Sequence, residues 1–226
     1  MRVVIINAQI PGVRLGLVEA TGARILPAPP ELACELDAVS ERLRRELTIE
    51  QVAELDAVSD VRTMFRSWGV DPARYRPSSE ALLRRVVAGK GLYRVSNVVD
   101  INNLGSIETG WPYGSYDRAR LEPPVTFRLG RRGETYEGIG KHTWHLEDRP
   151  VLADLLGPFG SPISDSVRTM ITEVTSAVLM VIYAPAGSTA RAIRQGLEQC
   201  ALRLERFAGA RIETTEVLNG SGWPAD

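Results

Sequence analysis

Apolar runs along the chain predict buried strands. The first, residues 3–6 (VVII), ends at Asn7, and residues 13–25 (VRLGLVEATGARI) alternate apolar and polar side chains as a strand does. Residues 175–185 (TSAVLMVIYAP) give the strongest strand pattern, because they are apolar, rich in β-branched residues and stop at a proline. Residues 210–220 (ARIETTEVLNG) predict a last strand at an edge.

Helical spacing governs most of the first ninety residues. Residues 28–47 begin with two prolines and then place apolar side chains at helical intervals: Leu32, Leu36, Val39, Leu43 and Leu47. A second helix is predicted within residues 49–69. A third follows a loop in residues 71–89, with Ser78 or Ser79 as its cap and Gly89 as its stop. Residues 189–209 predict a long amphipathic helix near the other end of the chain.

The middle of the chain is typical of strands. Residues 94–104 (RVSNVVDINNL), 125–130 and 134–140 favour extended structure, the last two separated by the turn GRRG. Helices therefore come first, strands fill the middle and a helix–strand pair closes the sequence. No linker or repeat divides it, so one α+β domain over residues 1–226 is expected, with a mixed sheet flanked by helices.

Composition and charge limit the classes of function. Of 226 residues, 44% are apolar and 24% are charged, as in a soluble globular protein, and the net charge of −1 disfavours bulk electrostatic binding of long nucleic acids. A local basic patch stays open. Cys34 and Cys200 lie far apart, which favours a reducing compartment. The apolar run after Met1 is too short for a signal core or a membrane span. We therefore expect a cytoplasmic protein without a membrane partner.

The sequence contains no motif that supports a metal site or a cofactor site. His142 and His145 fall in a segment expected to be extended, where alternation directs them to opposite faces. No P-loop, Rossmann fingerprint or G-x-S-x-G elbow occurs in the sequence. We expect neither a metal site nor an organic cofactor.

Residues 98–117 (VVDINNLGSIETGWPYGSYD) are dense in amide, hydroxyl and glycine residues, and they predict a polar binding loop entered from a strand. With the helix before it, this stretch resembles the B3/B4 module of the phenylalanyl-tRNA synthetase β subunit. The matching residues are the Arg84–Arg85 pair, a strand at Val98–Asp100, Asn103, the E-x-G-x-P turn of Glu108, Gly110 and Pro112, and the Tyr116–Asp117 pair. The resemblance covers about residues 60–190 and is closest to free-standing B3/B4 proteins.

This resemblance implies an editing function. The synthetase module hydrolyses the ester that joins a wrong amino acid to the 3′ end of a tRNA, without a metal or cofactor. Three of its polar residues are replaced here: a His by Gly114, a Thr by Asn102, and a Glu by a residue at or near Val181. A glycine in place of an imidazole predicts open space at Gly114 and a pocket for a different amino acid side chain, or for none.

Hydrolysis of an activated ester needs an oriented water and a stabilised oxyanion. We predict that Asn102, Asn103 and Asp165 supply these as catalytic residues. One wall of the pocket is expected at Asn102, Asn103 and residues 110–114, and the other at residues 160–166. The predicted substrate-binding residues are Glu108, Gly110, Trp111, Gly114, Tyr116, Gly160, Ser161, Ser166 and Arg168. Arg84 and Arg85 are predicted to bind RNA.

Each of these residue sets has a structural alternative. Asp100 and Asn103 are also typical turn caps, the 164–166 triplet (SDS) is typical of a loop, and arginine pairs such as Arg131–Arg132 are typical of solvated faces. Two functions therefore stay open. One is a trans-editing protein that binds the aminoacylated tRNA acceptor end and hydrolyses a mischarged ester. The other is a non-catalytic module that binds RNA or a small ligand.

Overall fold

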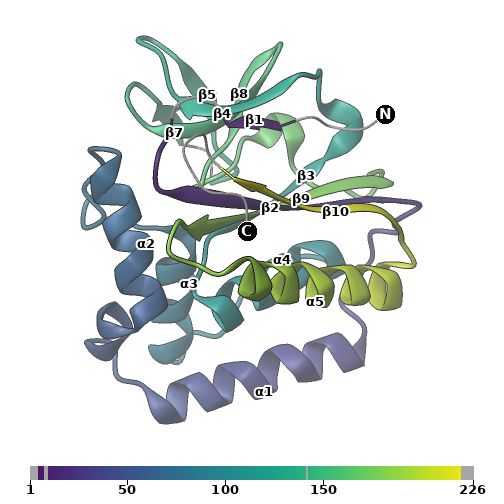
Figure 1. The fold of residues 1–226 in the computed structure, drawn as a ribbon. Helices are drawn as coiled ribbons and strands as arrows, with labels where there is room; N and C mark the ends of the chain where they lie inside the picture. The colour runs from purple at the N-terminus through teal and green to yellow at the C-terminus, as the bar shows by residue number, and fades with distance from the viewer. Residues whose placement is uncertain (1–4, 8–9, 141, 220–226) are drawn as a thin grey trace.

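Two sheets and a layer of helices are stacked in the molecule (Figure 1). The computed structural model describes residues 5–7, 10–140 and 142–219. The central sheet has the order β10 (Arg211–Asn219), β2 (Val13–Thr21), β9 (Ala177–Pro185) and β3 (Tyr113–Asp117). The upper sheet has the order β1 (Ile5–Asn7), β4 (Val125–Leu129), β7 (Pro150–Asp154) and β8 (Gly157–Gly160). A small hairpin pairs β5 (Thr135–Glu137) with β6 (Thr143–His145).

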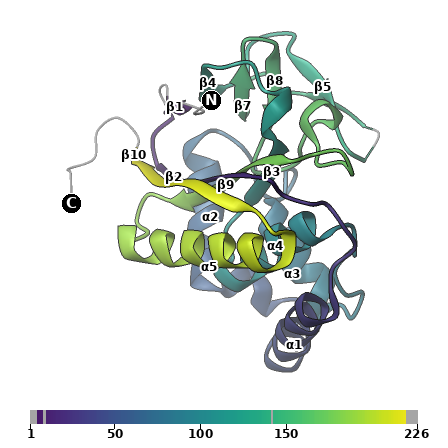
Figure 2. The ribbon, with the colours of Figure 1, turned by 90° about the vertical axis from the view of Figure 1, so that its right-hand side faces the viewer.

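Helices cover the lower face of the central sheet. Helix α5 (Ala190–Ala208) runs under it beside α4 (Asn97–Thr109), with α1 (Pro30–Glu46) lower still, as Figure 2 shows. Helices α2 (Asp56–Ser67) and α3 (Ser78–Val87) complete this layer, and short 3-10 helices occur at Gln51–Glu54, Arg118–Arg120 and Val167–Thr169. Both sheets and the helices contribute to one continuous cluster of buried apolar side chains.

Strand β9 lies at the centre of the molecule. It pairs antiparallel with β2 over nine residues, from Val13 opposite Pro185 to Thr21 opposite Ala177, and with β3 on its other side. Side chains from both sheets interlock above it, where the Phe127 and Tyr183 rings lie 5.5 Å apart and the Tyr116 ring meets Phe159 edge-on at 5.0 Å. All residues from Val178 to Pro185 are buried, because this strand is covered on both faces.

Most predicted elements are confirmed. The strands expected in residues 13–25, 175–185 and 210–220 are β2, β9 and β10, and the Leu-rich helix begins at Pro30 as expected. The long amphipathic helix ends at Gly209, which is left-handed with φ of 63°. The run at residues 3–6 lies partly outside the described residues, and Ile5–Asn7 is a strand. The α+β class is confirmed.

The strand and loop predicted in residues 94–117 are wrong for their first part. Residues Asn97–Thr109 form α4, with Ser96 accepting a hydrogen bond from the Val99 N–H at its start and Gly110 ending it at φ of 74°. Nine of its residues are buried, so apolar and small polar residues lie all round it. A helix buried on nearly every side shows no clear apolar stripe, and the β-branched Val98–Val99 pair then favours the wrong assignment.

The predicted cap of the third helix is also wrong. Pro77, rather than Ser78 or Ser79, stands at the cap position of α3, with no side-chain hydrogen bond to the helix. Proline sets the required backbone angle in place of a hydroxyl cap. Among the described residues, no helix combines the length and the apolar character needed to cross a membrane.

Two glycines let the helices approach the sheet. A Cβ at Gly105 of α4 would come within 2.7 Å of the Tyr113 ring, and a Cβ at Gly196 of α5 would come within 2.9 Å of the Tyr113 hydroxyl. Helices α4 and α5 can therefore pack this closely against Tyr113 only because Gly105 and Gly196 lack a side chain. The same approach places α4 against β3, where the pocket described below begins.

We expect Gly105→Ala to destabilise the protein by roughly 1–3 kcal/mol, although alanine favours helix, because the methyl group overpacks against a buried ring. The matched control is Gly187→Ala, at a position where a Cβ would meet no atom within 4 Å and φ is not positive. That change should be neutral or stabilising by less than about 1 kcal/mol. Urea unfolding of both variants checks this, and equal stabilities would show that Tyr113 moves aside freely.

Candidate functional site

A hollow of about 590 Å³ opens beside the β3 edge of the central sheet. We call it the α3–α4 pocket. Its walls are α3, the segment after α3, the middle of α4, Tyr113 and the loop after β8. The lining residues used below are Arg76, Ser78, Arg84, Arg85, Lys90, Tyr93, Asn102, Asn103, Tyr113, Ser164 and Asp165.

All three predicted catalytic residues line this pocket. Asn102 and Asn103 come from α4, and Asp165 comes from the loop between β8 and the 3-10 helix at Val167–Thr169. The predicted RNA-binding residues Arg84 and Arg85 line it too. Asn103 and Asp165 are more than sixty positions apart in the sequence, yet both line this pocket. Amide, carboxyl and guanidinium groups can therefore contact the same ligand.

The Asp165 carboxyl group is held from one side. Its Oδ1 atom accepts the Tyr116 hydroxyl at 2.7 Å and the Ser161 backbone N–H at 3.3 Å. Burial raises the pKa of Asp165 to about 7, against the opposing effect of these two hydrogen bonds. Both donors reach Oδ1, so Oδ2 is the oxygen left for a ligand or a water molecule.

Serines of the neighbouring loop are used to build the loop. The Ser161 hydroxyl donates to the Ser164 carbonyl at 2.8 Å and accepts the N–H groups of Ile163 and Ser164. The Tyr136 hydroxyl reaches the same carbonyl from β5. The Ser166 hydroxyl accepts the Arg168 N–H and caps the following 3-10 helix. The hydroxyl groups of Ser161 and Ser166 therefore stabilise the loop that carries Asp165.

Four polar atoms of the lining residues are buried without a hydrogen-bond partner among the described residues. They are Oδ1 of Asn102, a residue that is 8% exposed, the hydroxyl groups of Ser78 and Tyr113, and Nε of Arg85. The Asn102 amide group instead donates to Oδ1 of Asn103 at 3.5 Å. Buried polar atoms are nearly always paired in proteins, so unpaired ones in a pocket wall indicate a bound water molecule or a polar ligand.

Positive charge dominates the pocket wall. Arg76, Arg84, Arg85 and Lys90 stand against Asp165 among the described lining residues. The Nε atom of Arg84 donates to buried Glu80 at 2.8 Å, and the Arg85 guanidinium stacks 3.8 Å from the centre of the exposed Tyr93 ring. A chain with a net charge of −1 thus concentrates cations around one hollow.

Other predicted substrate-binding residues lie elsewhere. Glu108 forms a two-fold ion pair with Arg203 at 2.6 and 2.9 Å, and with Trp111 it lines a second hollow between α4 and α5. Arg168 is bound at 2.9 and 3.0 Å to both carboxylate oxygens of Asp154. Gly110 ends α4. Because α4 is a helix, its middle faces the α3–α4 pocket and its end faces the second hollow. The loop predicted from the sequence would have placed both sets of residues around one pocket.

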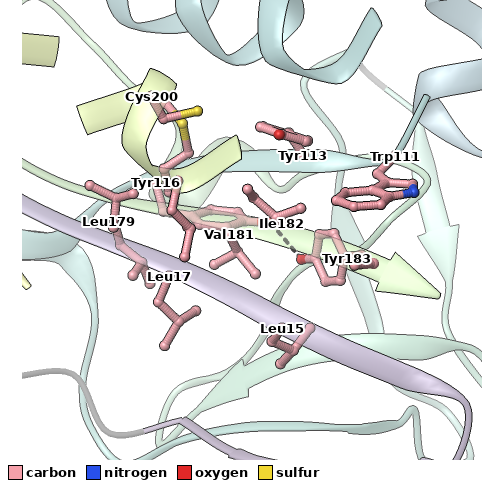
Figure 3. Close-up of a cluster of buried hydrophobic side chains, with 14 of the residues drawn as sticks. Leu15, Leu17, Trp111, Tyr113, Tyr116, Leu179, Val181, Ile182, Tyr183 and Cys200 are labelled. Atoms are coloured by element: carbon pink, nitrogen blue, oxygen red, sulfur yellow. Dashed lines mark hydrogen bonds between the residues drawn. The ribbon is translucent and has the colours of Figure 1, made fainter. Parts of the chain in front are cut away.

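The open space expected at Gly114 is filled by the protein itself. A Cβ there would lie 2.2 Å from the Tyr116 hydroxyl oxygen, and one at Gly160 would lie 2.3 Å from the same atom. Figure 3 shows the Tyr116 hydroxyl meeting that of Tyr183, and the two oxygens are 3.0 Å apart. Tyr116 thus occupies the space above Gly114, and its hydroxyl donates a hydrogen bond to Asp165.

Several lining residues escaped the sequence analysis. Arg76, Lys90 and Tyr93 flank α3 and carry no signal until the neighbouring α4 is known to be a helix. Tyr183 does not line the pocket, but it did carry a signal, because it is a hydroxyl-bearing residue within an otherwise apolar buried strand. A buried tyrosine hydroxyl generally has a polar partner, which would have directed attention to Tyr116 or Asp165.

Comparison with known proteins places these residues in a family. A family model described as the B3/4 domain matches residues 60–209. The phenylalanine–tRNA ligase beta subunit from Thermobifida fusca is 31% identical over 50% of the chain and 13% of its own length. The same subunit from Sodalis glossinidius is 33% identical over 47% of the chain and 14% of its own length. The subunit from Oceanobacillus iheyensis is 24% identical over 81% of the chain and 22% of its own length. The chain therefore matches under a quarter of each of these relatives.

A solved structure also resembles the chain. An N-terminal fragment of the phenylalanyl-tRNA synthetase beta subunit from Pyrococcus horikoshii covers 93% of this chain with a TM-score of 0.48 and 14% identity. The chain covers 50% of that fragment.

We expect Asp165 to make stability depend on pH. Its pKa is near 7 in the fold and about 3.9 when unfolded, so between these values the folded protein keeps a proton that the unfolded chain has released. Raising the pH through this window lowers the free energy of unfolding. Wild type should therefore lose stability relative to Asp165→Asn between about pH 4 and pH 8, by on the order of a few kcal/mol. Urea unfolding across this range measures the difference, and parallel curves would contradict the shift.

Proposed function

This chain belongs to the B3/4 domain family, and we propose that its α3–α4 pocket binds the 3′ end of an aminoacylated tRNA and hydrolyses a wrongly attached amino acid. One observation carries the proposal: the pocket combines a carboxyl group of pKa near 7 with two asparagine amides and four cations. The similar proteins named above are subunits of a tRNA ligase, which supports a tRNA as the ligand.

The chemistry follows from the groups that face the pocket. In its ionised form, Asp165 takes a proton through Oδ2 from a water molecule, whose oxygen attacks the ester carbonyl carbon. A base with a pKa near 7 is well matched to this step at neutral pH. The Asn103 amide N–H groups stabilise the oxyanion. The bond to the ribose oxygen then breaks, and that oxygen takes the proton from Asp165. The amino acid leaves with a free carboxyl group, and Asp165 is ionised again.

The remaining wall suits the nucleic acid and the amino group. Arg76, Arg85 and Lys90 attract the backbone phosphates, and the exposed Tyr93 ring offers a stacking surface for an unpaired base. The buried Oδ1 of Asn102 accepts a hydrogen bond from the α-ammonium group of the aminoacyl ester. Each group thus has a partner on the same ligand.

A non-catalytic binding module is the second candidate. It is favoured by the absence of the three polar residues of the synthetase module, replaced by Gly114, Asn102 and a residue at or near Val181, and by the structural use of Ser161 and Ser166. Such a module would use the same pocket and the same cations. The two candidates differ in whether the ester is cleaved.

Hydrolysis is tested with one tRNA charged in turn with each of the twenty amino acids. We expect at least one of these esters to be cleaved faster than without protein. Asp165→Asn should lower that rate by about a hundredfold or more, because it removes the base. Release of the labelled amino acid measures the rate.

The matched control is Asp148→Asn, which makes the same change at an exposed turn of positive φ that asparagine also tolerates. Its rate should equal that of wild type. Cleavage of none of the twenty esters, together with retained RNA binding, would support the non-catalytic module instead.

RNA binding should depend on the pocket cations. We expect Arg76→Gln with Lys90→Gln to weaken binding of a short acceptor-stem RNA with a single-stranded 3′ end, and to reduce the slope of log K against log salt by roughly 0.7 for each phosphate that is no longer neutralised. Arg84 is left intact because its Nε atom lies 2.8 Å from a carboxylate oxygen of buried Glu80, whereas the Nε atom of Arg76 lies 3.9 Å from the same oxygen. The control, Arg131→Gln with Arg132→Gln, removes two exposed charges away from the pocket. Equal effects in both variants would mean that only net charge matters.

A further inference from the structure

The Asp165 carboxyl group is the end of a chain of buried hydroxyl groups. Tyr183 of β9 lies 3.0 Å from Tyr116 of β3, oxygen to oxygen, and Tyr116 lies 2.7 Å from Oδ1 of Asp165. Both tyrosine side chains are fully buried. The chain therefore runs from the strand at the centre of the molecule to the wall of the α3–α4 pocket.

The direction of this chain is fixed by its chemistry. An ionised carboxylate only accepts, so the Tyr116 hydroxyl donates to Asp165 and its own oxygen accepts the Tyr183 hydroxyl. Burial, and then the nearby Asp165 charge, raise the pKa of Tyr116 well above its usual value, so this hydroxyl keeps its proton. A donor that is itself hydrogen-bonded is polarised and binds its acceptor more strongly.

Two glycines provide the space for the middle of the chain. The Tyr116 hydroxyl oxygen lies where the Cβ atoms of Gly114 and Gly160 would otherwise be, at 2.2 and 2.3 Å from those positions. Gly114 belongs to β3 and Gly160 to β8, so the phenol end lies between the central sheet and the upper sheet. Any side chain at either position would push the hydroxyl away from Asp165.

We propose that Tyr116 is a positioning residue for the hydrolytic step: with Tyr183 it fixes the Asp165 carboxyl group at the α3–α4 pocket, and Gly114 and Gly160 maintain the space it needs. This inference rests on the proposed function of Asp165 as the base. With Oδ1 held by Tyr116 and the Ser161 N–H, the carboxyl group cannot rotate, and Oδ2 is directed to one place.

Other groups around Asp165 define the controls. Tyr136 of β5 is a third buried tyrosine in contact with the same loop, but its hydroxyl binds Ser161 and the Ser164 carbonyl and not the carboxyl group. The cations Arg76, Arg84, Arg85 and Lys90 line the same pocket on its α3 side. Tyr136→Phe therefore loosens the loop without removing a hydrogen bond from Asp165, and it leaves every pocket charge in place.

The test is the titration of the Asp165 carboxyl carbon by NMR in the full chain, with the signal assigned from its loss in Asp165→Asn. Donation to the charged form lowers a carboxyl pKa, so Tyr116→Phe should move the midpoint upward by roughly one pH unit. Tyr183→Phe should move it in the same direction by less. Tyr136→Phe should lower the melting temperature and leave the midpoint unchanged.

The midpoint of the pH–rate profile for deacylation should move upward with the NMR midpoint in Tyr116→Phe. An unchanged NMR midpoint, or an equal shift in Tyr136→Phe, would overturn the inference. A shifted NMR midpoint in a protein that cleaves no ester would instead overturn the proposed function and leave the positioning chain standing. Should Tyr116→Phe fail to fold, Tyr183→Phe decides, because it leaves Tyr116 in contact with Asp165, and an unmoved midpoint then counts against the chain.

Discussion

Burial of β9 on both faces is the constraint on which the rest of the structure depends. Helices cover its lower side and the upper sheet covers its other side, so every residue from Val178 to Pro185 is withdrawn from solvent. A strand in this position can carry a polar group only if the neighbouring layers satisfy it. Tyr183 is such a group, and its partner Tyr116 leads the hydrogen bonds outward through β3, the edge strand, to Asp165. The pocket therefore lies at that edge.

The sequence predicted the helices that have one apolar and one solvent-exposed face, and the strands whose patterns are regular. Helices α1 and α5 show their period clearly, because each has a solvent side to mark the apolar one. Strands β2 and β9 are buried on both faces, and they were predicted from alternating side chains and from an unbroken apolar run. Helix α4 could not be found in this way, because it is buried nearly all round and carries Val98 and Val99, which favour strands. Its true form depends on packing against α5 and β3, which local patterns do not contain.

The candidate site was predictable to the same degree. Asn102, Asn103 and Asp165 were identified by residue type and by resemblance, and they line one pocket. Glu108 and Trp111 were assigned to that pocket because a loop was expected, and the helix carries them to another hollow. Arg168 could not be excluded from a pocket without knowing that Asp154 lies beside it. Partners so far apart in sequence meet only in the fold.

Position 114 shows how one side chain can fill the space that another position leaves open. The resemblance to the synthetase module predicted a pocket wall emptied by a glycine at this position. The structure fills that wall from two residues further along the same strand, with the Tyr116 hydroxyl. Residues two apart on a strand share a face, so a side chain at 116 can lean back over a glycine at 114. Only a glycine permits this, and the second glycine at 160 closes the slot from the upper sheet. The missing side chain is thus what lets a buried hydroxyl reach the carboxyl group at the pocket.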